Sequence, residues 1–88
     1  LELLRRGYTV YIGKQGVAKV DFVAERADNR LYIQVCYILT PENMEREFAP
    51  LEAIADNYEK LVLSTDTLLS INRGGIRQKS IRSFLLEE

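Results

Sequence analysis

Two polar side chains, Asp21 and Gln34, lie within stretches that are otherwise typical of β-strands. Asp21 falls in residues 19–25 and Gln34 in residues 31–39, and both stretches are rich in β-branched and aromatic residues. A carboxylate inside an apolar strand needs a partner or a function, because the burial of a bare charge is costly. One expected partner for Asp21 is a neighbouring base such as Lys19 or Arg30.

The residue types that are missing exclude several kinds of chemistry. The chain has no histidine, which excludes His-based zinc sites, Ser-His triads and Cys-His pairs. Cys36 is the single cysteine, so it forms no disulfide within the chain, and this usage favours a reducing cytoplasm. A lone thiol in an apolar strand, with no histidine to activate it, is predicted to be a small buried hydrophobe rather than a nucleophile.

Composition indicates one small domain of 88 residues. The net charge is −1, from 12 basic and 13 acidic residues, which argues against a domain whose main task is to bind nucleic acid. No apolar run is long enough to span a membrane and no signal peptide is evident, so no membrane partner is expected. The chain begins without Met or a helix cap, and we expect residues 1–88 to be an N-terminally truncated fragment of a longer polypeptide.

A β-hairpin is expected to position Asp21 and Gln34. Strands over residues 17–25 and 31–39 flank the turn-forming segment 26–30. Alternation predicts two faces for the first strand, with Val20, Phe22 and Ala24 opposite Asp21, Val23 and Glu25. In the second strand, Tyr32, Gln34, Cys36 and Ile38 are predicted to lie opposite Ile33, Val35 and Tyr37. Gln34 is expected to be an inward amide that hydrogen-bonds Asp21 and the backbone.

The N-terminal part of the chain supplies the elements before this hairpin. Residues 1–6 suit the end of a helix that stops at Gly7, and residues 8–12 suit a strand. Residues 13–16 contain two glycines and predict a hairpin turn. This segment lacks the Walker pattern and opens no helix, so the turn is favoured over a phosphate-binding loop.

The remaining elements follow in the order helix, strand, strand, helix. Thr40 and Pro41 predict a helix start, Pro50 predicts a break or kink over 48–50, and residues 56–57 end the helical stretch. Its core residues recur at helical spacing: Met44, Phe48, Leu51 and Ala55. A buried strand is predicted over 61–63, a loop over 64–72 with a helical turn at 67–71, and a turn at 74–75. A strand over 76–81 and a helix over 83–88 complete the chain. The crossover predicts parallel pairing of the returning strand.

These elements and motifs resemble the restriction-endonuclease-like superfamily, whose PD-(D/E)xK signature sits on an αβββαβ core. More narrowly, LLRRGYxVYxGK, VDFVA, YIQV and EREFxPLxxIxDNY are similar to a C-terminal nuclease-like domain of bacterial and archaeal AAA-type ATPases, a domain of unknown function. The resemblance covers nearly the whole chain, from Leu3 to Leu86. It implies an α/β fold with a central mixed sheet and an ATPase module upstream in the same polypeptide.

The resemblance also implies roles for three positions. In such nucleases two carboxylates bind Mg²⁺, and a Lys two residues along the strand adds positive charge near the attacking water. Asp21 fits the first position, Gln34 replaces the second carboxylate, and Cys36 replaces the Lys. These vestigial positions imply neither a catalytic residue nor a metal ligand. Glu25 is about 13 Å from Asp21 along an extended strand, too far to complete one ion site, and the family's helix carboxylate would lie upstream of Leu1.

Basic residues are the remaining candidates for binding a partner. They are Lys14, Lys19, Arg73, Arg77 and Lys79, and Arg82 also lies in this C-terminal run. Arg77 and Lys79 are predicted to share a strand face, so a local patch for nucleic acid competes with a simple solvated face.

The functional expectation is a non-catalytic accessory domain of an AAA-type ATPase, which binds a partner or nucleic acid. It needs no cofactor of its own, and ATP would bind only the upstream module. The alternative is a Mg²⁺- or Mn²⁺-dependent nuclease that uses Asp21 and an upstream Glu. A third expectation is a homo-oligomer, because a meander sheet leaves an unpaired edge.

Overall fold

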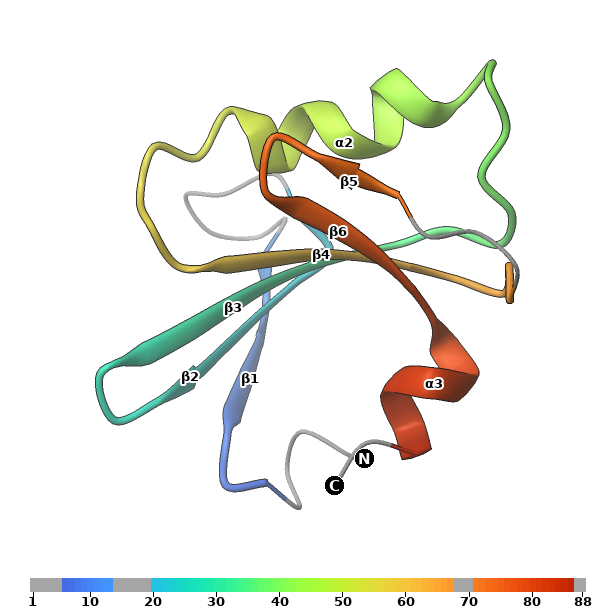
Figure 1. Ribbon diagram of the computed structural model, residues 1–88. Coiled ribbons are helices and arrows are strands. Elements are labelled where there is room, and N and C mark those ends of the chain that lie inside the picture. The colour runs from blue at the N-terminus through green and yellow to red at the C-terminus, as the bar shows by residue number, and fades with distance from the viewer. Residues whose placement is uncertain (1–5, 14–19, 68–70, 87–88) are drawn as a thin grey trace.

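A mixed six-stranded sheet in the order β1-β2-β3-β4-β6-β5 forms the centre of the computed structural model, which describes residues 6–13, 20–67 and 71–86 (Figure 1). The strands are β1 (Thr9–Ile12), β2 (Phe22–Arg26), β3 (Asn29–Val35), β4 (Glu59–Ser64), β5 (Asn72–Arg73) and β6 (Ile76–Ser80). β1, β2 and β3 pair antiparallel, β4 lies parallel to both β3 and β6, and β5 pairs antiparallel with β6. The predicted α/β class with a central mixed sheet is confirmed.

The hairpin of β2 and β3 is tighter and shorter than predicted. Arg26 pairs with Asn29, so only residues 27–28 form the turn, and Ala27 adopts a φ of 52° there. β3 ends at Val35 rather than at residue 39. Beyond that point the backbone is held by a neighbouring loop, because Thr65 N–H donates to the Tyr37 carbonyl at 2.9 Å and Leu39 N–H donates to Asp66.

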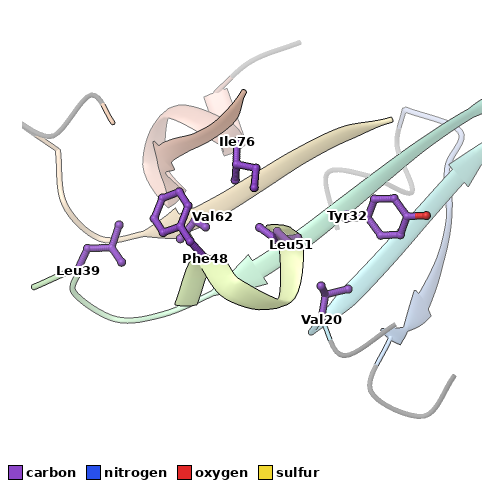
Figure 2. Close-up of a cluster of buried hydrophobic side chains, with 7 residues drawn as sticks. All are labelled: Val20, Tyr32, Leu39, Phe48, Leu51, Val62 and Ile76. Carbon is purple, nitrogen blue, oxygen red and sulfur yellow. The ribbon is translucent and has the colours of Figure 1, made fainter. Parts of the chain in front are cut away.

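Helices α2 (Met44–Glu52) and α3 (Ile81–Leu86) lie on opposite faces of the sheet (Figure 1). The core under α2 combines residues from the sheet and from the helix, as Figure 2 shows: Val20, Tyr32, Leu39, Phe48, Leu51, Val62 and Ile76. The core on the α3 side consists of Ala24, Leu31, Ile33, Leu61, Leu63 and Phe84. Among the described residues, neither helix is long and apolar enough to cross a membrane.

The predicted alternation is confirmed inside the strands and fails at their ends. Tyr32 faces α2 while Leu31 and Ile33 face α3, as a pleated strand requires. Val20 was predicted to share a face with Ala24, and this is wrong, since Val20 packs under α2. It lies before β2 begins, where the pleat does not apply. Ile38, beyond the end of β3, is exposed rather than aligned with Tyr32.

Helix α2 differs from its prediction at both ends and at Pro50. It begins at Met44, after a turn in which Thr40 N–H donates to Asn43 Oδ1 and Met44 N–H donates to the Thr40 carbonyl. Of the predicted break or kink at Pro50, the break is wrong, because the helix continues to Glu52. Burial of Phe48 and Leu51 against the sheet offsets the hydrogen bond that a proline cannot donate. The early end leaves Ala55 exposed and outside the helix.

The C-terminal elements are largely as predicted, with one addition. The turn at Gly74 and Gly75 is confirmed, with φ values of 61° and 89°, and β6 occupies most of the predicted strand. Asn72–Arg73 forms β5, a strand that was not predicted and whose first residue was assigned to the end of a loop. α3 begins at Ile81 instead of residue 83, because the Ser80 hydroxyl accepts the Ser83 N–H and caps the first turn. The predicted N-terminal helix and the helical turn at 67–71 involve residues 1–5 and 68–70, outside the described ranges.

Candidate functional site

The structure brings Asp21 and Gln34 together at the start of β2 and the end of β3. Asp21 N–H donates to Gln34 Oε1 at 3.1 Å, and Asp21 Oδ2 accepts the Val35 N–H at 2.8 Å. The predicted contact between the two residues is confirmed, although Gln34 binds the backbone of Asp21 rather than its carboxylate. Arg30 is held by Glu25, to which its Nε donates at 2.8 Å. Lys19, the other predicted partner of Asp21, lies outside the described residues.

Glu47 joins this site from helix α2, and the sequence reasoning missed it. Gln34 Nε2 donates to Glu47 Oε1 at 3.2 Å. The Glu47 side chain is only 12% exposed, so this carboxylate lies between the helix and the sheet. A signal existed in the helical spacing, since Glu47 falls on the same face as Met44, Phe48 and Leu51. The Gln34 amide therefore links the chain at Asp21 to a carboxylate of α2.

Cys36 lies beside these acidic groups and carries no charge at neutral pH. It is half-buried and packs against the core under α2, as predicted for a small hydrophobe. Burial, reinforced by the nearby carboxylates of Glu47, Asp66 and Asp21, raises the pKa of the thiol to about 11. The position that the resemblance assigns to a Lys ammonium therefore holds a neutral side chain.

A second polar group, formed by Ser64, Asp66 and Gln78, lies at the carboxyl end of β4. Ser64 Oγ donates to Asp66 Oδ2 at 2.8 Å, and Gln78 Nε2 donates to Ser64 Oγ at 2.9 Å. The Leu39 N–H, followed by the Ser64 hydroxyl, lowers the pKa of Asp66. Gln78 Oε1 is buried and has no hydrogen-bond partner among the residues that the structure describes. This group was not predicted from the sequence, because its members lie on separate elements.

A polar network at the opposite end of β3 fixes Lys60 in the protein interior. Lys60 is 9% exposed, and its Nζ donates to Asp56 Oδ1 at 3.1 Å and to the carbonyls of Asp56 and Tyr58. The Tyr32 hydroxyl donates to Asp56 Oδ2 at 2.6 Å and accepts a hydrogen bond from Arg30. Burial alone would raise the pKa of Asp56, but hydrogen bonds from Tyr32, Tyr58 N–H and Lys60 together lower it. A cavity of about 310 Å³ adjoins this network.

The predicted binding residues are distributed over both faces of the sheet. Arg73 reaches α2, where it pairs with Glu52 at 3.0 Å and Glu45 at 3.3 Å. Arg77 and Lys79 align with Leu61 and Leu63 of β4, which places them on the α3 side, and Arg77 pairs with Glu59 at 2.7 Å. Lys14 and Lys19 lie outside the described residues, and the binding role of all five stays a prediction.

The carboxylates of the described residues do not converge on one point. No group of three or more Cys, Asp or Glu side chains in residues 6–13, 20–67 and 71–86 is placed to hold a metal ion. Glu25, which the sequence placed too far from Asp21 for one ion site, pairs with Arg30 at 2.5 Å. The described site therefore consists of the Gln34 amide, which bonds the Asp21 N–H and the Glu47 carboxylate, and of the Asp21 carboxylate, which accepts the Val35 N–H.

Comparison with known proteins finds a similar protein of undescribed activity. No family model matches the chain. An uncharacterized protein of Haemophilus influenzae is 45% identical over 64 residues, a match that covers 73% of this chain and 16% of that protein. The chain therefore spans about a sixth of the relative that it matches, and that protein's description states no activity.

Proposed function

We propose that this chain is a non-catalytic accessory domain that carries a degenerate PD-(D/E)xK site. In this proposal it belongs to a cytoplasmic AAA-type ATPase and binds a partner or nucleic acid. The observation that carries the proposal is the Gln34 amide, whose Nε2 donates to Glu47 while its Oε1 accepts the Asp21 N–H.

The chemistry of this amide supports the loss of metal-dependent cleavage. A Mg²⁺ site needs hard anionic oxygens, and an amide brings no negative charge. The Gln34 N–H group points at Glu47, so it occupies a carboxylate oxygen that would otherwise be available to a cation. The neutral Cys36 thiol supplies no positive charge for a developing phosphoryl transition state. The loss of one such stabilising group commonly costs about 10²–10³ in rate.

The order of the described elements supports the link to nuclease-like domains of larger proteins. β1, β2, β3, α2 and β4 follow one another as the βββαβ part of that core requires. In the Haemophilus influenzae protein the matching segment is joined to a much longer chain, as expected of an accessory domain. The upstream module would hydrolyse ATP, and this domain would contact the partner or nucleic acid.

A cleavage assay tests the non-catalytic part of the proposal. The protein is incubated with single- and double-stranded DNA and RNA in Mg²⁺ and in Mn²⁺, and no cleavage is expected. Asp21→Ala is the matched control for contaminating nucleases. Cleavage that disappears in Asp21→Ala would favour the alternative, a Mg²⁺- or Mn²⁺-dependent nuclease that uses Asp21 with a Glu upstream of Leu1.

The ATPase part is tested by the coding sequence upstream of Leu1. We expect a Gly-rich loop that ends in Gly-Lys-Ser or Gly-Lys-Thr, whose backbone amides bind phosphates. An upstream sequence without this loop would contradict the ATPase link while leaving the cleavage result intact.

A further inference from the structure

The two edges of the sheet differ in how well they are protected from pairing with another strand. β5 is two residues long, and its Arg73 is engaged in ion pairs with Glu45 and Glu52. Short length and charge are common means of blocking an edge. β1 has the sequence TVYI, without charge or proline, and its register with β2 runs without a bulge. Tyr11 is 51% exposed and Ile12 is 57% exposed.

The backbone groups of Val10 and Ile12 point away from the sheet. Gly13 N–H donates to the Asp21 carbonyl at 3.0 Å, which marks this pair as hydrogen-bonded across β1 and β2. Hydrogen-bonded and non-hydrogen-bonded pairs alternate in an antiparallel ladder, so Tyr11 also bonds to β2 while Val10 and Ile12 do not. In the part of the chain that the structure describes, no further strand pairs with β1.

Apolar side chains continue from this edge across both faces of the sheet. On the α3 side, register aligns Ile12 with Phe22 and Phe22 with Ile33. An apolar cavity of about 210 Å³ adjoins this row, and Val35 and Leu85 also line it. On the α2 side, a second row runs across the same strands: Tyr11, Val23 and Tyr32.

We propose that β1 is a homodimer interface, in which it pairs antiparallel with β1 of a second copy about a two-fold axis at Tyr11. Ile12 of each copy then pairs with Val10 of the other, and each pair exchanges the outward backbone hydrogen bonds. Tyr11 lies opposite Tyr11 of the second copy. This inference goes beyond the proposed function and does not depend on the nuclease resemblance or on an ATPase.

The sequence of β1 favours β1 of a second copy as its partner strand, and it favours the register with the two-fold axis at Tyr11. With the axis at Tyr11, the rows Ile33–Phe22–Ile12 and Val10–Ala24–Leu31 join into one apolar row across the dimer. On the other face, the two Tyr11 rings adjoin, and aromatic cross-strand pairs stabilise a sheet. With the axis at Val10, Tyr11 would instead lie beside Thr9 of the second copy, whose neighbour is Glu25. The strand is therefore complementary to itself in the Tyr11 register.

The interface is small, and its strength sets the design of the first test. One short strand pair buries less than the 1,200 Å² that is typical of stable complexes, so the dimer is expected to form in the micromolar to millimolar range. Sedimentation velocity over a concentration series should show conversion from monomer to dimer. Ile12→Lys should shift this conversion at least tenfold higher in concentration. Tyr37→Lys, at an exposed aromatic residue outside β1, should leave it unchanged.

Cysteine cross-linking tests the register directly. In a Cys36→Ala background, Tyr11→Cys should form an intermolecular disulfide on mild oxidation, because non-hydrogen-bonded pairs have Cα atoms about 4.5 Å apart. Thr9→Cys is the matched control and should not cross-link, since residue 9 lies away from the axis. Circular dichroism confirms that each variant is folded.

Several results would overturn the proposal. A protein that stays monomeric up to about 1 mM, well within the concentration range expected for the dimer, has no such interface. Dimers that persist unchanged in Ile12→Lys use another surface. Dimers in which Thr9→Cys cross-links as readily as Tyr11→Cys do not have the Tyr11 register.

Discussion

At the scale of single residues, Gln34 replaces a charge by a pair of hydrogen bonds. Its amide accepts one hydrogen bond from Asp21 N–H and donates one to Glu47. A carboxylate of the same size could keep the first bond and not the second. The amide that the resemblance places where a carboxylate is usual therefore has a specific partner, Glu47.

Gln34→Glu should lower the free energy of unfolding at pH 7 by about 1–3 kcal/mol, because Glu47, whose side chain is only 12% exposed, loses the Gln34 donor and faces a like charge. The double variant Gln34→Glu/Glu47→Gln exchanges donor and acceptor and should recover most of this loss. Urea unfolding of the four proteins in this cycle measures the coupling. If Gln34→Glu and the double variant lose the same free energy of unfolding, the Gln34–Glu47 hydrogen bond does not contribute to stability.

Cys36 should react slowly with alkylating reagents. Its pKa of about 11 lies above the ordinary value of 9.0, so the thiolate fraction at pH 8 is about a hundredfold smaller than in the unfolded chain. The rate of iodoacetamide modification, followed by mass spectrometry, should rise by roughly that factor in denaturant. A native rate equal to the unfolded rate would contradict the role of burial.

The sequence predicted the Asp21–Gln34 contact because both residues interrupt strands that pair locally. It did not predict Glu47 or the bonds of Asp66, since these side chains reach the site from α2 and from the loop after β4. Such contacts depend on how far α2 extends over the sheet, which local spacing does not determine.

At the scale of elements, close approach explains one glycine that turn rules alone do not. A Cβ at Gly13 would lie 2.5 Å from the Val20 carbonyl oxygen. Gly13→Ala should therefore force β1 and the start of β2 apart and cost about 1–3 kcal/mol of stability. Urea unfolding measures this cost. Gly74→Asn is the control, because its φ of 61° suits Asn and no atom of the described residues lies within 4 Å of the added Cβ.

Most elements were predictable from short-range patterns, and the errors share a cause. The strands around Asp21, the buried β4 and the glycine turn before β6 follow from alternation and turn residues. A helix break at Pro50 and a loop that extends to Asn72 were wrong because packing overrode local preference. Phe48 and Leu51 hold the end of α2, and pairing with β6 orders Asn72–Arg73.

At the scale of the whole molecule, acid should destabilise the fold through Asp56 and Asp66. Both carboxyl groups have a pKa lowered from 3.8 in the folded state. A lowered folded pKa contributes stability above the unfolded value, and this stability is lost as the pH falls through the folded pKa. The urea concentration at the midpoint of unfolding should therefore decrease when the pH is lowered below about 4. Asp66→Asn should flatten this dependence.

The parallel pairing of β4 with both β3 and β6 has a consequence for synthesis on the ribosome. β4 is almost wholly buried, and one of its two flanking strands is β6, near the end of the chain. In a nascent chain that has emerged only to residue 64, the edge of β4 that later pairs with β6 is unpaired, and the apolar side chains of β4 are exposed. Premature termination before residue 76 should therefore yield insoluble or chaperone-bound products, even though every residue of the Asp21–Gln34–Glu47 site has already been made.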